Sequence, residues 1–135
     1  MTGRIQVAVG VLLGADQTLL IQQRREGTDC AGLWEFPGGK LECGESPEAA
    51  LERELKEELG IKLIELSFLS QLNHDYAHAN VSLHAYLVHR WSGQPEGIEG
   101  QAIAWEMPEE ILRYDLLEAA YPILEQAAAR LRSSV

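Results

Sequence analysis

Hydrophobic and polar residues alternate along several stretches of this chain, the spacing that places apolar side chains on one face of a β-strand. In the first stretch, at about residues 4–13, the residues on that face are Ile5, Val7, Val9 and Val11. Further strands are expected at about residues 18–25, 63–73, 80–91 and 101–106. Segments rich in glycine and polar residues, such as GADQ and SGQPEGIEG, lie between strands and predict turns or loops.

Apolar residues recur every four positions in another stretch, which is the spacing of an amphipathic helix. The residues of this stripe are Leu51, Leu55 and Leu59. Ser46 is a good N-cap, Pro47 suits the first helical position, and Gly60 suits the residue after the last turn. These signals predict a helix between Ser46 and Gly60.

A second helical stripe lies near the C-terminus, at about residues 118–132. Its members are Ala120, Ile123, Leu124, Ala127 and Leu131. The segment PEEILR, shortly before it, is expected to form one helical turn. Strands and helices in this order predict one α/β domain, residues 1–135, with helices packed on the faces of a mixed sheet.

The composition describes a globular domain with an acidic surface. Of the 135 residues 46% are hydrophobic, and the formal net charge is -10. An acidic surface repels the phosphate backbone of DNA or RNA, which argues against a nucleic-acid-binding protein. It does not exclude a small anionic substrate, because bound divalent cations can reverse the local charge.

The location predicted from the sequence is the cytoplasm. No apolar run approaches the ~18 residues of a membrane span, and we recognise no signal peptide. Cys30 and Cys43 form neither a disulfide framework nor a zinc-binding spacing. We therefore expect no membrane partner, and a monomer, with a dimer as the alternative.

Acidic residues are concentrated in the stretch GGKLECGESPEAALERELKEELGI, residues 38–61. Three of them lie three or four positions apart, on one edge of the predicted helix: Glu54, Glu57 and Glu58. They could form a solvated acidic face, partly neutralised by Arg53 and Lys56. Alternatively they could bind a hard cation, because oxygen ligands without His or Cys suit Mg²⁺ or Mn²⁺ rather than zinc. In that case Arg53 could hold Glu57, four residues later, in place.

The same stretch resembles the Nudix box, here residues 39–61. Gly39 is followed after five residues by Glu45 and after seven more by RELKEELGI. The segments QVAVGVLL, WEFPGGK, LVHRWSGQP and EGQAIAW also resemble the MutT-like branch of the Nudix family. The resemblance implies a Nudix α/β/α sandwich with a mixed β-sheet between helices. It also implies a hydrolase dependent on Mg²⁺, with Mn²⁺ as a possible substitute, that acts on a small-molecule nucleotide.

Roles carried over from the resemblance fall on the acidic residues and their neighbours. The expected metal ligands are the Gly38 carbonyl, Glu54, Glu57, Glu58 and Glu99. Either Glu54 or Glu99 would be the base that prepares the attacking water. Glu45 and Arg53 would support the catalytic site. The remaining alternative for Glu99 is an ordinary loop residue.

The resemblance also implies a set of substrate-binding residues. They are Arg24, Asp29, Glu35, Phe36, Pro37, Gly38 and Ala120. Arg24 could reach the phosphates or the base, or could be a surface residue. Of the two aromatic residues beside Glu35, Phe36 is a better candidate for the base pocket than Trp34.

Ala120 departs from the pattern of the branch that removes oxidised guanine nucleotides. An Asn is expected there to read the purine edge, and an alanine side chain forms no hydrogen bond. The favoured reaction is conversion of 8-oxo-dGTP to 8-oxo-dGMP and pyrophosphate, a step in nucleotide-pool sanitation and mutation avoidance. The first alternative is a pyrophosphohydrolase of CTP, dCTP or 5-methyl-dCTP. The second is a Nudix module that senses a nucleotide without hydrolysing it.

Overall fold

The computed structural model describes residues 3–133, whose strands form two sheets. The larger sheet has the order β4 (Gly38–Lys40), β1 (Ile5–Leu12), β6 (Asn80–Ser92) and β5 (Lys62–Asp75). The smaller sheet has the order β3 (Trp34–Glu35), β2 (Leu19–Gln23) and β7 (Ile103–Glu106). The predicted strands are therefore confirmed, although they divide between two sheets where the sequence suggested one.

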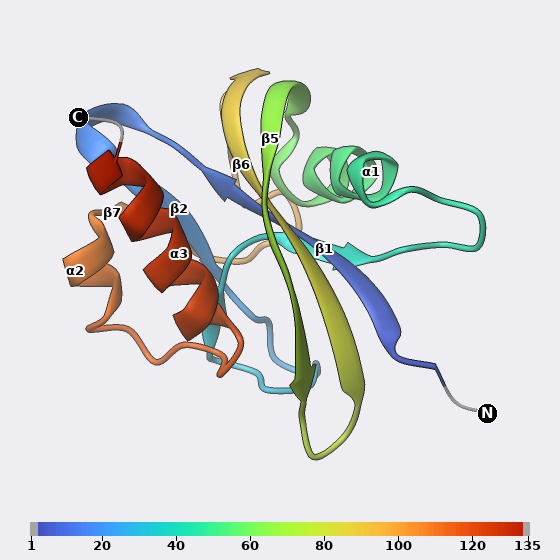
Figure 1. Cartoon of the computed structure of the whole chain (residues 1–135). Helices are drawn as coiled ribbons and strands as arrows, with labels where there is room; N and C mark the ends of the chain where they lie inside the picture. Colours follow the sequence, from blue (N-terminus) through green and yellow to red (C-terminus); the bar gives the residue numbers. More distant parts are fainter. Residues whose placement is uncertain (1–2, 134–135) are drawn as a thin grey trace.

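The larger sheet is mixed, as predicted. Strand β1 pairs parallel with β6, whereas β4 pairs antiparallel with β1 and β5 pairs antiparallel with β6. The long β5–β6 hairpin crosses β1 in Figure 1 and extends well beyond it. Its register shifts at three places, one of them between Phe68 and Ser70, as at a β-bulge or a similar irregularity.

Helices cover both faces of this sheet, which confirms the α/β/α class. Helix α1 (Pro47–Leu59) lies on one side in Figure 1, and α2 (Pro108–Ile111) and α3 (Ala120–Ser133) lie on the other. Each side has its own apolar core, because neighbouring residues of β1 point in opposite directions. Ala8 and Leu12 pack with the α1 leucines, and Val9 and Val11 pack with the buried face of α3.

Helix α1 begins and ends where the sequence signals predict. The Ser46 hydroxyl accepts a hydrogen bond from the Ala49 amide at 3.1 Å, and Pro47 is the first helical residue. Gly60 has the left-handed conformation with φ of 72°, and its amide donates to the Lys56 carbonyl. These caps satisfy groups that would otherwise lack partners at the helix ends.

Other boundaries shift by a few residues. Strand β2 ends at Gln23, so Arg24 and Arg25 open the loop that follows. Helix α3 begins at Ala120, after a turn in which the Ala120 amide donates to the Leu117 carbonyl. The GADQ turn contains one turn of 3₁₀ helix, η1 (Ala15–Gln17). In residues 3–133 no helix is both long and apolar enough to span a membrane.

The segment WEFPGGK connects the two sheets. Its first residues form β3 in the smaller sheet, and its glycines form β4 in the larger one. Phe36 and Pro37, between the two strands, are buried. The predicted site residues of this segment therefore lie at the junction of the sheets.

Candidate active site

The glycine pair allows α1 to approach β4 closely. A side chain at Gly39 would place its Cβ 2.3 Å from the carboxyl carbon of Glu54. At Gly38 a Cβ would lie 2.0 Å from the carbonyl oxygen of Ala8. The carboxylate of Glu54 can therefore lie against the strand only because residue 39 has no side chain.

Glu58 is buried at the inner edge of α1, one turn from Glu54. Its Oε1 accepts a 2.6 Å hydrogen bond from Gln22 Nε2 and a longer one, 3.4 Å, from the Gly38 amide. Burial, and after it a hydrogen bond with Glu54, raises the pKa of Glu58 well above its ordinary value of 4.5. The carboxyl group at position 58 is therefore costly to ionise without a positive charge beside it.

The contact between Glu54 and the buried Glu58 suits this pair of residues to a cation. Two carboxylates in contact repel each other unless a positive charge lies between them. In residues 3–133, no three His, Cys, Asp or Glu side chains are already arranged to hold a metal ion together. The oxygen-only donors still fit a hard divalent cation, since Glu58, Glu99 and the backbone of Gly38 line one cavity.

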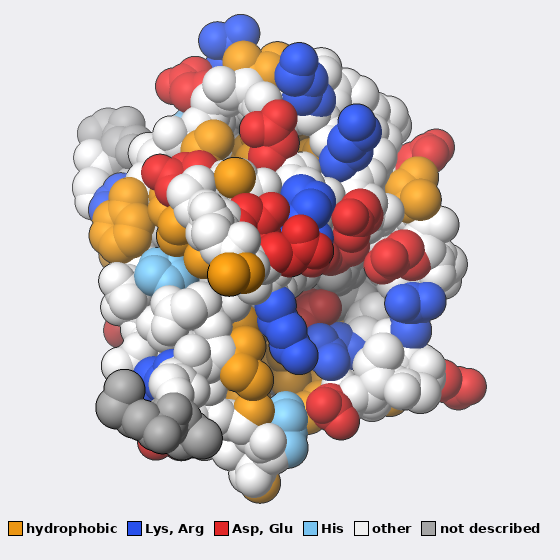
Figure 2. All heavy atoms as spheres, turned by 90° about the vertical axis from the view of Figure 1, so that its right-hand side faces the viewer, with side chains coloured by type: hydrophobic (Ala, Val, Ile, Leu, Met, Phe, Trp, Pro, Cys, Tyr) orange, Lys and Arg blue, Asp and Glu red, His pale blue; other side chains and the backbone are white. Residues whose placement is uncertain are grey.

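Glu57, another predicted ligand, differs from its neighbours in exposure. Its side chain is 55% exposed, compared with 18% for Glu54. Figure 2 shows acidic side chains gathered around basic ones on the side of the molecule that carries α1, above a hollow in the surface. Glu57 is thus positioned on the solvent side of the acidic group.

Arg53 braces the loop that leads into α1. Its Nε and Nη2 donate to the two carboxylate oxygens of Glu45 at 2.9 and 3.0 Å, and Nη2 also donates to the Lys40 carbonyl. Its Nη1 donates to Glu54 at 2.8 Å, while Glu57 lies farther away at 3.8 Å. The sequence pointed to Glu57 as the partner of Arg53, but the close partners are Glu45 and Glu54. The hydrogen bond from Arg53 lowers the pKa of Glu45 to about 2.

Glu99 lies on the loop of residues 93–101, which is bound to the end of α1. The amides of Glu96 and Ile98 donate to the carbonyls of Leu59 and Glu58, both at 3.1 Å. The last carbonyls of a helix have no partner within it, so the loop satisfies two of them. This brings Glu99 to the same polar cavity as Glu58.

The polar cavity has a volume of about 160 Å³. The predicted site residues on its wall are Arg24, Glu35, Gly38, Glu58 and Glu99. Five further lining residues carried no signal in the sequence: Gln22, Gln23, Arg25, Thr28 and Gln101. Basic, acidic and amide groups are therefore gathered in one small space, which suits a phosphate chain together with cations.

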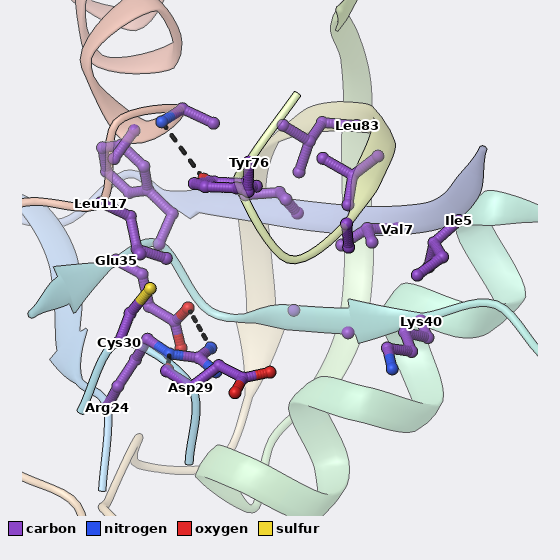
Figure 3. Close-up of a pocket in the computed structure, with 18 of the residues that line it drawn as sticks. Ile5, Val7, Arg24, Asp29, Cys30, Glu35, Lys40, Tyr76, Leu83 and Leu117 are labelled. Carbon is purple, nitrogen blue, oxygen red and sulfur yellow. Dashed lines mark hydrogen bonds and ion pairs between the residues drawn. The ribbon is translucent and has the colours of Figure 1, made fainter. Parts of the chain in front are cut away.

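A larger, mainly apolar cavity of about 470 Å³ adjoins the polar one. Val7 and Leu83 project into it from the large sheet, and Leu117 closes the side near α3 (Figure 3). Phe36 and Ala120, which the sequence predicts to bind the substrate, also line it. The volume is within the range of about 300–1,000 Å³ typical of small-molecule sites.

Arg24 stands where the two cavities meet. Its Nη1 donates to Glu35 at 3.1 Å, and its Nε donates to the carbonyl of Asp29. Glu35 and Gly38 also line both cavities. Burial raises the pKa of Glu35 even though the Arg24 cation opposes that shift.

Pro37 differs from the other predicted substrate residues. It is buried, does not line either cavity, and its carbonyl accepts a hydrogen bond from the Gly10 amide. Asp29 does line the apolar cavity, where Figure 3 shows its carboxylate at the open side near Arg24. Pro37 therefore shapes the site through the backbone.

The tip of the β5–β6 hairpin provides residues that sequence reasoning missed. Tyr76 and His78 line the apolar cavity and stack with ring centroids 5.4 Å apart. The Tyr76 hydroxyl accepts a hydrogen bond from the Ala119 amide, and His78 lies 4.0 Å from Asp29. Because the hairpin tip has no motif, only its contact with residues far along the chain identifies it.

Known proteins match most of the chain. The NUDIX domain family matches residues 4–127. The chain is 43% identical over 101 residues to an 8-oxo-dGTP diphosphatase of Haemophilus influenzae, covering 75% of this chain and 74% of the relative. It is 40% identical over 117 residues to the CTP pyrophosphohydrolase of Escherichia coli, covering 87% of each. A solved structure from work on MutT of Aliivibrio salmonicida and Vibrio cholerae superposes with a TM-score of 0.83 and 36% identity, covering 95% of this chain and 99% of that one.

Proposed function

The chain belongs to the Nudix family of hydrolases, and we propose that it hydrolyses a nucleoside triphosphate to the monophosphate and pyrophosphate. The observation that carries this proposal is the pair of adjoining cavities. A mainly apolar space of about 470 Å³ would receive the base and sugar, and a polar space of about 160 Å³ would receive the phosphates. Arg24 and Glu35, which line both, would lie beside the bond that joins the two parts of the substrate.

Nudix hydrolases generally use divalent metals, and we propose Mg²⁺ here, with Mn²⁺ as a substitute. Its ligands would be the Gly38 carbonyl together with Glu54, Glu57, Glu58 and Glu99. When bound, such an ion neutralises phosphate charge and lowers the pKa of a coordinated water. The exposed position of Glu57 suits it to an ion that approaches from the solvent side.

The protein's own residues would orient the reaction. Arg53 holds Glu54 against Gly39, and Glu45 in turn holds Arg53. Either Glu54 or Glu99 would accept the proton of the attacking water. Arg24, fixed by Glu35, would bind a phosphate oxygen at the junction.

The preferred substrate in this proposal is 8-oxo-dGTP. Its support is the identity to the Haemophilus influenzae diphosphatase and the size of the apolar cavity. Hydrolysis of this nucleotide would cleanse the free nucleotide pool, a reaction of the cytoplasm. The substrate is a single nucleotide, which agrees with a net charge of -10 that disfavours polynucleotides.

Hydrolysis of CTP or dCTP is the second candidate, and two observations favour it. The alignment with the CTP pyrophosphohydrolase covers more of this chain than the alignment with the diphosphatase. The cavity wall at Ala119 and Ala120 is also apolar, and the amides of both residues already donate, to the Tyr76 hydroxyl and the Leu117 carbonyl. Neither an alanine side chain nor a free amide would therefore read a purine edge there.

A panel of kcat/KM values tests whether the preferred substrate is 8-oxo-dGTP or a cytidine nucleotide. The substrates are the common NTPs and dNTPs, 8-oxo-dGTP, 5-methyl-dCTP and nucleotide sugars, each assayed with Mg²⁺ by pyrophosphate or phosphate release. We expect 8-oxo-dGTP to have the highest value, and a preference for cytidine nucleotides would replace it with the second candidate. If no nucleotide were hydrolysed but nucleotides still raised the melting temperature, the protein would be a sensor.

A further inference from the structure

Two buried glutamine side chains link the Glu58 carboxylate to the backbone amide of Glu99 at the polar cavity. Gln22, on β2, is 5% exposed, and Gln101, just before β7, is 9% exposed. Gln101 Oε1 accepts from the Glu99 amide at 3.0 Å, and its Nε2 donates to the Glu58 carbonyl at 2.9 Å and to Gln22 Oε1 at 3.1 Å. Gln22 Nε2 in turn donates to the carboxylates of Glu58 at 2.6 Å and Glu35 at 3.2 Å.

The direction of this chain of hydrogen bonds is determined by the backbone. An amide N–H can only donate and a carbonyl can only accept, so Glu99 and Glu58 fix which end of the Gln101 amide faces each of them. That orientation turns the Gln101 Nε2 toward Gln22, which must present its oxygen in return. The Gln22 Nε2 is therefore left to face the Glu58 carboxylate, and neither amide can flip without placing like groups in contact.

Gln22 and Gln101 contact both the 93–101 loop and the Glu58 carboxylate, which meet at the polar cavity. The backbone bonds of Glu96 and Ile98 attach the 93–101 loop to α1, but the amide of Glu99 itself is held by the Gln101 side chain. Gln22 holds the carboxylate of Glu58 through a short bond. The loop position and the carboxylate orientation are thus set by one connected unit.

An apolar pair of similar size would fill this space, but it would leave the Glu58 carboxylate, the Glu58 carbonyl and the Glu99 amide without these partners. The polar pair is therefore explained by the groups that it satisfies and orients. Resting on the proposed function, in which Glu58 and Glu99 hold the cation, we propose that Gln22 and Gln101 are positioning residues, which set the Glu58 carboxylate and the backbone of Glu99 for the ion.

The test compares Gln22→Met, Gln101→Met and the double variant, which keep side-chain length but lose the amide. The control is Gln71→Met, because Gln71 is exposed on β5 and donates to Ser82 away from the cavities. Mn²⁺ affinity is measured by spin resonance without nucleotide. We expect a loss of about tenfold or more for each single variant, the range found when a residue that supports metal ligands is removed. The double variant should lose less than the product of the two, because both residues act in one network.

Amide hydrogen exchange provides a second readout that does not depend on a metal. Exchange at Glu99 should become at least tenfold faster in Gln101→Met and stay unchanged in Gln71→Met. Lower melting temperatures with unchanged Mn²⁺ affinity and unchanged exchange at Glu99 would show that the glutamines have a structural role alone, and would overturn the inference.

If the variants do not fold, a measurement on the wild type tests the positioning role of Gln22 and Gln101. The side-chain amide protons of Gln22 and Gln101 should exchange slowly and shift on addition of Mg²⁺, whereas those of Gln71 should do neither. Fast exchange in all three would overturn the inference. Absence of nucleotide hydrolysis with intact Mn²⁺ binding would instead refute the proposed reaction, so the two failures are distinct.

Discussion

The polar and the apolar cavity adjoin each other but are built in different ways. In the polar cavity the functional side chains are bonded to one another, as Glu58 is to Gln22 and Glu35 is to Arg24. In the apolar cavity the wall consists of residues such as Val7, Leu83 and Ala120, which contribute shape. A bonded network tolerates few changes, whereas an apolar wall can be altered with moderate effect.

In the proposed reaction, this difference would give the two cavities separate tasks. Chemistry needs groups held in one geometry, which the polar cavity provides through hydrogen bonds. Discrimination among bases depends on a few polar groups around an apolar space, here Asp29, Tyr76 and His78 at its rim. Substitutions in the polar cavity should therefore change the rate, and substitutions in the apolar cavity should change the choice of substrate.

Replacement of Glu54 should have the largest effect. Glu54→Gln removes a charge at the proposed cation while keeping the size of the side chain. The loss of several kcal/mol of transition-state stabilisation, of which ~4 kcal/mol corresponds to roughly a thousandfold, should remove most turnover. The measurement is kcat at saturating Mg²⁺, with Glu52→Gln on the exposed side of the same helix as the control.

The fold should survive this change. The metal-free melting temperature of Glu54→Gln should be no lower than that of the wild type, because removal of a charge next to Glu58 offsets the weaker bond from Arg53. Near-normal kcat in saturating Mg²⁺ would remove Glu54 from the proposed metal site.

Replacement of Glu99 tests whether the 93–101 loop belongs to the polar cavity in function. Glu99→Gln should lower kcat or raise the Mg²⁺ concentration needed for half-maximal activity by about tenfold, corresponding to roughly 1.4 kcal/mol. Nucleotide binding, measured by calorimetry with Ca²⁺ in place of Mg²⁺, should persist. Unchanged metal dependence would return Glu99 to the role of an ordinary loop residue.

Ala120→Asn tests the apolar cavity. Asn would restore a donor and an acceptor at the wall, and a buried hydrogen bond contributes about 1 kcal/mol. The preference for 8-oxo-dGTP over dGTP should rise by about tenfold at most, mainly through KM. Ala129→Asn, exposed on the same helix, controls for helix propensity. Lower activity on 8-oxo-dGTP, together with a wild-type preference for CTP or dCTP, would favour the cytidine reaction.

The smallest effect is expected on stability, from loss of the ion pair between Glu45 and Arg53. The pKa of Glu45 is lowered to about 2 in the folded protein, from an ordinary value of 4.5. Its contribution to the free energy of unfolding is therefore fully present above pH 4.5 and is lost as the pH falls through 2. Glu45→Gln should lower the melting temperature by a few degrees at pH 7. The difference from the wild type should shrink between pH 4.5 and pH 2, and a constant difference over that range would contradict the ion pair as its cause.

Local signals in the sequence were sufficient for α1 and for the acidic residues on it. Ser46, Pro47 and Gly60 act on groups within four residues, so their effect can be read without the fold. The contact between Glu54 and Glu58 likewise follows from helical spacing. The strands were predicted from alternation, but their division into two sheets was not, because alternation does not say which strand pairs with which.

What the sequence determined by itself is the Nudix box, the helix that carries it and the family to which the chain belongs. Only the tertiary structure decided that Glu58 is buried, that Gln22 and Gln101 connect it to Glu99, and that Tyr76 and His78 reach the second cavity. The physical reason is the range of the interactions. Caps and helical neighbours act over a few residues, whereas burial and the glutamine bonds join segments from β2, α1 and the 93–101 loop that only the folded chain brings together.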